Sequence, residues 1–495
     1  MNVLYAVSEI FPMIKTGGLA DVAGALPSAL TETGVSIKIL VPGYPQVLEK
    51  MGKTSDPLFI CDISDPLFPG RTRLLEGKLP DGSSNPPDVW VVENSSLFER
   101  DGGPYNDIYG HDWHDNAIRF GAFSRAAAIL STADSPAGWI PSILHLNDWQ
   151  TGLAAAYLHY LPSDSKARTV LTIHNIAYTG IFDRYWLGPL NLPPESFSMY
   201  GVEFFGSISF LKAGIFFSNA ITTVSPTHAW EIQTPEGGHG LHGLLATRRN
   251  DLTGILNGAD YKTWNPAEDP FLEQHYGPRN LTRKEDNKTA LRKETGLSED
   301  HPGPLFGMVS RLNRDKGTDL IIDGLPAILE EGQLVVLGSG DPEMELSFRK
   351  EAEKYPVRIA ARTGYDETLA HRIIAGSDFF LMPSRMEPCG LTQMYAMRYG
   401  TLPIVRKVGG LADSLENIPE DQDGSGKTPN AGTGIVFEDP SPAALSHAVK
   451  RAGSLYRNQR SMNSARKRAM SKDFSWTQSA LRYRDLYETL LHKKH

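Results

Sequence analysis

The chain alternates short apolar, β-branched runs with longer helical stretches, and this alternation limits the folds open to it. Runs that suit strands occupy residues 3–7, 37–41, 89–92, 143–146, 170–173 and 221–224. After a polar stretch from 260 to 304 the pattern resumes at 305–309, 334–337, 357–360, 379–382 and 403–405. Such alternation is typical of α/β domains with parallel sheets. We therefore predict two domains, residues 1–255 and 256–475, with a lid or surface insertion after the boundary.

Local sequence patterns predict the structure of two further segments. Residues 476–495 carry Leu481, Tyr483, Leu486, Leu490 and Leu491 at helical spacing, which predicts an amphipathic C-terminal helix. Residues 421–434 are rich in Gly, Asp, Lys and Pro and predict an exposed loop.

Composition narrows the class of protein. With 495 residues and 40% hydrophobic content the chain can bury two cores, and a net charge of −9 argues against nucleic-acid and anionic-membrane partners. The two cysteines cannot form a disulfide framework, and no Cys and His cluster has zinc spacing. The first residues suit a strand rather than a signal peptide, and no run is long enough to span a membrane. We expect a cytoplasmic protein.

The pentapeptide Gly-Gly-Leu-Ala-Asp occurs twice, at 17–21 and 409–413, each time after an apolar run and at the expected start of a helix. Glycines let the backbone approach a ligand, and the first N–H groups of a helix attract anions, so a phosphate could sit at each copy. An ordinary strand-to-helix turn is the alternative. Lys15 beside the first copy favours a diphosphate there.

Charged residues follow two strands of the second domain. Arg311 and Lys316 leave the end of the strand at 305–310 together and could clamp a diphosphate, whose negative charge grows as it leaves. Glu387 follows the strand at 379–382, in a loop whose neighbouring Pro388 and Gly390 fix and free the backbone in turn, which suits a carboxylate presented to a ligand. A solvated basic turn and a surface glutamate are the alternatives. Cys389 is expected to pack against the ligand rather than act as a nucleophile.

Polar residues also end two neighbouring strands of the first domain. One strand ends with His145, Asp148 and Trp149, and the next ends with His174 and Asn175. Because the carboxyl ends of parallel strands meet at one edge of a sheet, we expect these residues to converge on one crevice. The glycine- and histidine-rich stretch 231–243 could line the same crevice as a mobile loop, and its two histidines are a weak metal signal.

Taken together, these motifs resemble those of bacterial glycogen synthases and plant starch synthases over essentially the whole chain. The resemblance rests on the segments 15–22, 147–149, 172–175, 224–226, 255–258, 310–312 with 316–317, 383–385 with 387–391, and 409–411, which occur in the family's order.

This resemblance implies the glycosyltransferase-B architecture: two Rossmann-like domains, a deep interdomain cleft, and a last helix crossing back to the first domain. It implies transfer of glucose from ADP-glucose to the non-reducing 4-OH end of an α-1,4-glucan, with retention of configuration and release of ADP. No cofactor or metal is expected, and the expected partners are ADP-glucose and a glycogen primer. Front-face attack assisted by the leaving phosphate is the expected route, rather than the covalent intermediate of retaining glycosidases.

The resemblance also assigns roles to individual residues. The expected catalytic set is Glu387, Asp21, His174, Arg311 and Lys316, with the backbone carbonyl of His174 near the anomeric carbon. Substrate-binding roles are expected for Lys15, Gly17, Gly18, Asn257, Tyr365 beside the base, Cys389, Gly390, Leu391, Thr392, Asp148 and Trp149.

Two departures from the family pattern are present. Tyr395 stands where many retaining relatives have a second Glu, so ribose recognition is expected to use backbone groups. The loop 236–242 lacks the aromatic and acidic residues that the family often carries there, which leaves the acceptor contacts open. A UDP-glucose transferase, a glucan phosphorylase holding pyridoxal phosphate, and an inactive glucan-binding scaffold are the rival functions.

Overall fold

A computed structural model describes residues 1–54, 56–83, 85–163, 165–420 and 431–493. The chain divides into two compact units, and each is described by itself. Unit 1 consists of Met1–Gly258 together with Trp476–His495, and unit 2 of Ala259–Ser475. The boundary thus follows Gly258 rather than residue 255, and Asn257 belongs to unit 1. The loop expected at 421–434 lies largely outside the described residues.

Unit 1 is built on a mixed sheet that, among the described residues, has nine strands. From edge to edge they are β12 (Leu252–Gly254), β11 (Ala220–Thr223), β7 (Arg168–Ile173), β6 (Ile143–Asn147), β1 (Asn2–Ala6), β2 (Ser36–Pro42), β5 (Asp88–Glu93), β4 (Arg73–Lys78) and β3 (Leu58–Asp62). The strands from β12 to β5 are parallel, and β4 and β3 are antiparallel. The sequence pattern predicted the central strands. Their side chains are buried on both faces of the sheet, so each strand appears in the sequence as a continuous apolar run.

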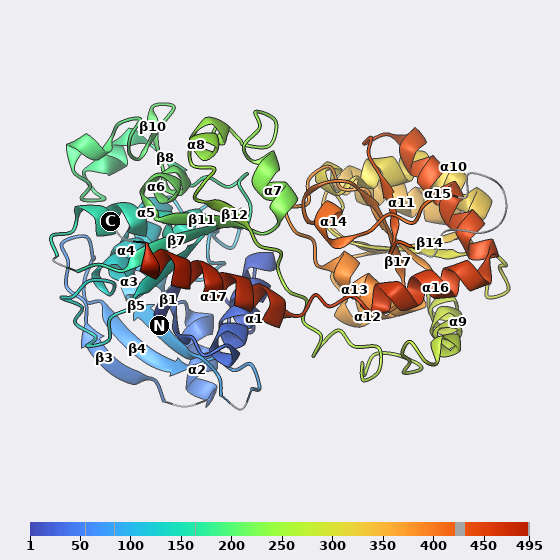
Figure 1. Ribbon diagram of the computed structural model, residues 1–495, viewed down its shortest axis with the longest axis horizontal. Helices are drawn as coiled ribbons and strands as arrows, with labels where there is room; N and C mark the ends of the chain where they lie inside the picture. Colours follow the sequence, from blue (N-terminus) through green and yellow to red (C-terminus); the bar gives the residue numbers. More distant parts are fainter. Residues whose placement is uncertain (55, 84, 164, 421–430, 494–495) are drawn as a thin grey trace. The chain divides into compact units, whose positions relative to one another are not determined.

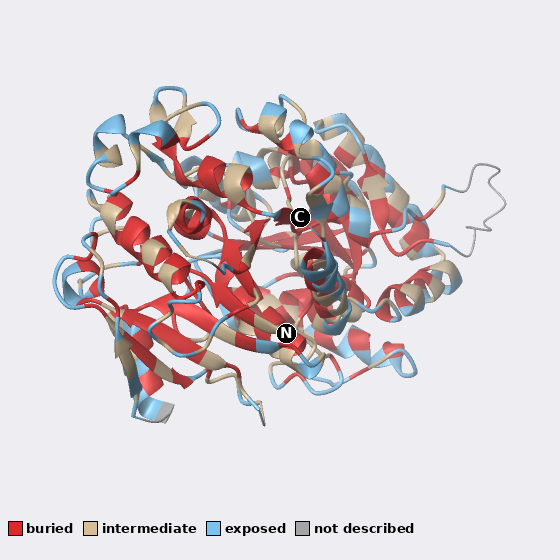
Figure 2. Cartoon of the chain, turned by 60° about the vertical axis from the view of Figure 1, so that its left-hand side comes forward, coloured by how far each residue is buried: buried red, intermediate tan, exposed pale blue. Residues whose placement is uncertain are grey.

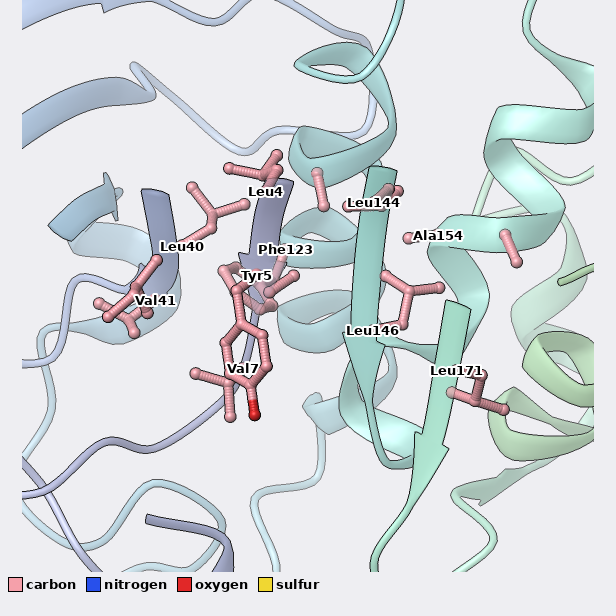
Figure 3. Packing of buried hydrophobic residues seen from close by; sticks show 14 of the residues in the cluster. Leu4, Tyr5, Val7, Leu40, Val41, Phe123, Leu144, Leu146, Ala154 and Leu171 are labelled. Carbon is pink, nitrogen blue, oxygen red and sulfur yellow. The ribbon is translucent and has the colours of Figure 1, made fainter. Parts of the chain in front are cut away.

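Helices surround this sheet, as Figure 1 shows. They are α1 (Gly18–Glu32), α2 (Pro45–Thr54), α3 (Ser95–Phe98), α4 (Asn116–Ile129), α5 (Trp149–Tyr160), α6 (Phe210–Phe217), α7 (Pro226–Glu231), α8 (His242–Thr247) and α17 (Trp476–His492). A small antiparallel sheet, β8 (Ile181–Phe182), β10 (Ser207–Ser209) and β9 (Glu203–Phe204), lies within the segment between β7 and α6. Leu4, Tyr5, Leu144 and Leu146 lie in the core on β1 and β6, with Phe123 of α4 (Figure 3).

The C-terminal helix α17 belongs to unit 1 although it is more than 200 residues distant in sequence from the rest of that unit. Its Tyr487 hydroxyl lies 2.6 Å from Nδ1 of His145, and its Ser479 hydroxyl donates to the Leu256 carbonyl at 2.6 Å. Tyr483, Tyr487 and Leu490 are buried in the unit 1 core. The amphipathic pattern therefore corresponds to one face that packs and one that remains in water, as the alternating burial colours of Figure 2 illustrate for the helices.

Unit 2 contains a sheet whose six described strands are all parallel: β15 (Ile359–Thr363), β14 (Gln333–Gly338), β13 (Leu305–Val309), β16 (Phe379–Met382), β17 (Leu402–Arg406) and β18 (Ile435–Phe437). Its helices are α9 (Lys284–Thr295), α10 (Thr318–Glu331), α11 (Pro342–Lys354), α12 (Glu367–Gly376), α13 (Thr392–Arg398), α14 (Gly409–Ser414), α15 (Pro442–Arg457) and α16 (Gln459–Met470). The predicted α/β class is confirmed, with an all-parallel sheet in unit 2 and a sheet in unit 1 that is parallel except for β4 and β3. None of the described helices is both long and apolar enough to cross a membrane.

The prediction of a lid or surface insertion after the boundary is wrong for α9, which packs against α12. Lys284 is buried and donates hydrogen bonds to the Ala375 carbonyl and the Thr401 hydroxyl, and Lys288 forms a buried ion pair with Asp378 at 2.7 Å. Burial lowers the pKa of Lys284 well below its usual value. These charged side chains can be buried because each one is hydrogen bonded or ion-paired to oxygen atoms.

Candidate active site

The turn that starts α1 in unit 1 is held by a carboxylate that the motif analysis missed. Glu9, buried just after β1, accepts hydrogen bonds from the Thr16 N–H at 2.5 Å, the Gly17 N–H at 3.2 Å and the Thr16 hydroxyl. The Tyr105 hydroxyl donates to the same carboxylate at 2.8 Å. Glu9 therefore fixes the turn from its inner side, and its place directly after the first strand was the signal that could have revealed it.

The outer side of this turn is open. A Cβ atom added to Gly17 or Gly18 would meet no atom within 4 Å, and both glycines are exposed together with Lys15. Lys15 Nζ lies 2.7 Å from Asp21 Oδ1, one turn into α1. The first N–H groups of α1 and a neighbouring cation thus face open space, an arrangement suited to an anion.

The carboxyl ends of β6 and β7 bring Asp148 and His174 together. Asp148 adopts a positive φ of 57°, and its Oδ1 accepts hydrogen bonds from the His174 N–H at 2.7 Å and the Asn175 N–H at 3.4 Å. Asn147 donates through Nδ2 to the Ala6 carbonyl, so its Oδ1 accepts from His174 Nε2 at 2.9 Å. The ring of His174 is therefore oriented with Nδ1 as its remaining acceptor.

Burial determines the charge of these two side chains. Desolvation lowers the pKa of His174 to about 3, so its ring is neutral near pH 7. Burial raises the pKa of Asp148 to about 7, and the two backbone N–H donors oppose this by favouring the ionised carboxylate. His174 is accordingly suited to hydrogen bonding and poorly suited to carrying a positive charge.

His145 and Trp149 are placed in packed surroundings. His145 is fully buried between the Tyr487 hydroxyl and the Thr172 hydroxyl, and desolvation lowers its pKa to about 3. The Trp149 indole packs within 7 Å of the rings of Phe120, Tyr105, Phe182 and Phe210. Both residues support the strand ends, and the His145 ring hydrogen bonds to Tyr487 and Thr172 rather than to Asp148 or His174.

In unit 2 the structure pairs two of the predicted charges. Lys316 Nζ lies 2.5 Å from Glu387 Oε2, and the Ser384 hydroxyl donates to the same oxygen at 3.1 Å. The side chains are 21% and 8% exposed, so the pair is mostly removed from water. Asn313 orients Lys316 by accepting a hydrogen bond from its N–H at 3.1 Å.

Arg311 follows β13 and is exposed, and its guanidinium has no hydrogen-bond or ion-pair partner among the residues that the structure describes. The strands β13 and β16 are neighbours, so Arg311 and Glu387 leave the same edge of the sheet. This edge thus presents the exposed Arg311 as well as the Lys316–Glu387 ion pair.

The second Gly-Gly-Leu-Ala-Asp copy does not resemble the first in its surroundings. Gly409 and Gly410 are buried, and the Gly410 N–H donates to the Glu387 carbonyl at 3.1 Å. A Cβ atom on Gly410 would lie 2.0 Å from the Cys389 carbonyl oxygen. The expectation of a phosphate at each copy is therefore corrected: the second copy supports the Glu387 loop, and only the first is open.

The remaining predicted residues of unit 2 lie beside this loop. Cys389 is buried, Gly390 has a φ of +69°, and Leu391 and Thr392 start the short helix α13. Tyr365 is 83% exposed at the end of β15. Tyr395 stacks on Trp264 at 4.4 Å, so it is part of an aromatic stack rather than a substitute for a carboxylate.

Asn257 lies in unit 1, where it is buried and its Oδ1 has no hydrogen-bond partner in the described part of the protein. The described residues contain no group of three or more His, Cys, Asp or Glu side chains that could hold a metal ion.

Two α/β units, one with an open turn suited to an anion and the other with a lysine–glutamate pair at its strand ends, are the arrangement of a glycosyltransferase of the two-domain, glycosyltransferase-B class. The model of the starch synthase catalytic domain matches residues 2–247, and that of glycosyl transferases group 1 matches residues 287–469. The chain belongs to the glycogen synthase and starch synthase family, and it is a glucosyltransferase.

Relatives of known name match the full chain. A glycogen synthase of Paramagnetospirillum magneticum is 50% identical over 99% of this chain and 98% of its own length. A glycogen synthase of Nitrosomonas europaea is 46% identical with the same coverage. The catalytic domain of starch synthase IV from Arabidopsis thaliana, solved with ADP and acarbose, is 34% identical with a TM-score of 0.83, covering 99% of both chains.

Proposed function

We propose that this enzyme transfers glucose from ADP-glucose to the 4-OH at the non-reducing end of an α-1,4-glucan, with retention of configuration and release of ADP. The observation that carries the proposal is the contact between Lys316 and Glu387 at the carboxyl ends of the unit 2 strands. The likeness to a starch synthase solved with ADP supports the choice of nucleotide.

The positively charged side chains make the main contribution to catalysis by stabilising the leaving phosphate. When the bond between glucose and diphosphate breaks, negative charge grows on the leaving phosphate, and Arg311 and Lys316 stabilise it in a preorganised position. Arg311 presents a planar fork to the phosphate oxygens, and Lys316 is oriented by its contact with Glu387. Within unit 1, Lys15 and the open turn at Gly17 and Gly18 are a second element suited to an anion.

The polar residues hold the glucose. Glu387 Oε2 is already bonded to Lys316 and Ser384, which leaves Oε1 to accept a hydrogen bond from a sugar hydroxyl. Asp148 anchors the His174 peptide through its N–H, so the His174 carbonyl is fixed for its role beside the anomeric carbon. The acceptor hydroxyl attacks from the face that the leaving phosphate vacates and passes its proton to that phosphate. Asp21, Asn257 and Tyr365 complete the donor contacts.

Release of ADP and UDP from the two donors, with glycogen as acceptor, tests this function. We expect ADP-glucose to be the better donor and the new linkages to be cleaved by an α-1,4-specific amylase. UDP-glucose as the preferred donor would replace the nucleotide assignment, and amylase-resistant product would contradict the linkage.

The same assay in excess EDTA tests the expectation that no metal is required, because side chains neutralise the diphosphate in this proposal. A strict Mg²⁺ requirement would contradict it. The two free cysteines, Cys61 and Cys389, support action in the reducing cytoplasm.

A further inference from the structure

Exposed apolar side chains gather in one short part of unit 1. Between β7 and α6 the structure exposes Tyr178, Ile181, Tyr185, Met199, Tyr200 and Phe205. Phe205 is 83% exposed, as much as Tyr365, the residue expected beside the base. Large apolar groups concentrated in this way on a protein surface commonly mark a binding site.

Phe205 occupies a backbone conformation that disfavours it. The hairpin between β9 and β10 pairs Phe204 with Ser207, so Phe205 and Gly206 form its two-residue turn. Both have positive φ, +50° and +83°, a conformation in which Asn or Gly is favoured and a bulky residue is an outlier. Neither turn geometry nor core packing therefore explains a phenylalanine at this position.

The ring of Phe205 lies against the loop 236–243, which follows α7. A Cβ atom on Gly240 would lie 3.0 Å from Phe204 Cζ and 3.1 Å from Phe205 Cε2, so this loop passes close to the two rings, and the positive φ of Gly240, +83°, also favours glycine there. The neighbouring His239 also has a positive φ, +46°, and its side chain is exposed. Phe205 and His239 are thus two strained, exposed residues on adjoining loops.

The hairpin is hydrogen bonded to the segment that follows β7. The Phe210 N–H donates to the Gly180 carbonyl at 3.0 Å, and the Ser209 hydroxyl donates to the Thr179 carbonyl at 2.8 Å. Lys212 donates to the carbonyls of Met199 and Glu203. The hairpin and the loop 236–243 therefore extend from β7 and β11, neighbouring strands whose carboxyl ends also carry His174 (Figure 1).

We propose that Phe205 is a glucan-binding residue, on whose ring a glucose unit of the acceptor chain stacks while His239 is placed to hydrogen bond a sugar hydroxyl. The C–H bonds on the face of a glucose ring carry slight positive charge and suit the negative face of an aromatic ring. A flat, exposed ring on a rigid hairpin loses little conformational entropy on binding. The ligand's identity as a glucan rests on the proposed function.

Phe205→Asn separates binding from folding, because Asn is favoured in this turn. We expect it to fold as well as the wild type or better, with an unchanged or raised Tm. We expect retardation by glycogen in native gels to weaken about three- to tenfold, and KM for maltohexaose to rise by a similar factor. The KM for ADP-glucose, and kcat at saturating glucan, should remain within about twofold of the wild-type values, because the residue contacts neither the donor nor the reacting atoms.

Phe205→Trp should retain glycogen binding, because it keeps an aromatic face. Phe59→Asn, which removes an exposed ring from β3 at the far edge of the nine-stranded sheet of unit 1, is the matched control and should bind as the wild type. Unchanged glycogen retention in Phe205→Asn, or equal loss in Phe205→Trp, would overturn the proposal. Retardation by glycogen in native gels is measured without a sugar donor. If the enzyme does not use ADP-glucose but still needs Phe205 to bind glycogen, only the proposed function is refuted.

Discussion

Replacing Lys316 by alanine removes a leaving-group cation and also leaves a buried carboxylate without its counter-ion. The first loss should lower kcat about 10² to 10³-fold, the usual cost of one preorganised electrostatic contact. The second should cost about 2 to 3 kcal/mol of stability, near the lower end for a broken ion pair, because Ser384 still donates to Glu387 and Lys316 is partly exposed.

A double variant separates these two effects. In Lys316→Ala with Glu387→Gln no buried charge remains unpaired, so most of the lost stability should return while kcat stays low. Arg311→Ala should lower kcat and leave Tm unchanged, because the Arg311 guanidinium has no partner in the described part of the chain. A purely structural residue would give the reverse, a lower Tm with little change in kcat.

The assay is ADP release at saturating ADP-glucose and glycogen, with thermal unfolding of each variant measured in parallel. Lys472→Ala is the control, since Lys472 also lies 2.5 Å from a glutamate of unit 2 but both side chains are well exposed, and it should change little. Near-normal kcat in Lys316→Ala would refute the assignment. Recovery of kcat together with stability in the double variant would reduce both Lys316 and Glu387 to structural residues.

Other predictions concern single positions. Gly410→Ala should destabilise unit 2 strongly because its Cβ meets backbone at 2.0 Å, whereas Gly18→Ala should fold normally, and equal stability of the two would contradict the different roles of the repeats. Cys389→Ser should keep substantial activity, and a sugar adduct on the thiol would refute this. Burial raises the pKa of Asp148 to about 7. The stability of the wild type relative to Asp148→Asn should therefore be greatest below about pH 4, and it should fall by up to about 4 kcal/mol as the pH rises through about 7. Urea unfolding of both proteins across this pH range measures the difference, and a rise in relative stability would contradict the pKa shift.

Local pattern was enough to predict the parts of this protein that depend on near neighbours in sequence. Apolar runs at strand spacing located the central parallel strands, and the charged motifs at their ends located Lys316 and Glu387 as candidates. The position of Asp148 and His174 after adjacent runs also predicted that they would meet, because parallel strands end at one edge of a sheet.

Only the tertiary structure distinguished residues with the same local sequence or the same chemical type. The two Gly-Gly-Leu-Ala-Asp copies differ because one faces open space and the other packs on the Cys389 carbonyl. Lys284 is buried and Arg311 is exposed, although both are cations in polar stretches. The contact of the Phe205 ring with Gly240 joins two loops 35 residues apart. Burial and hydrogen-bond partners arise from chain segments far apart in sequence, and no local pattern records which segments meet.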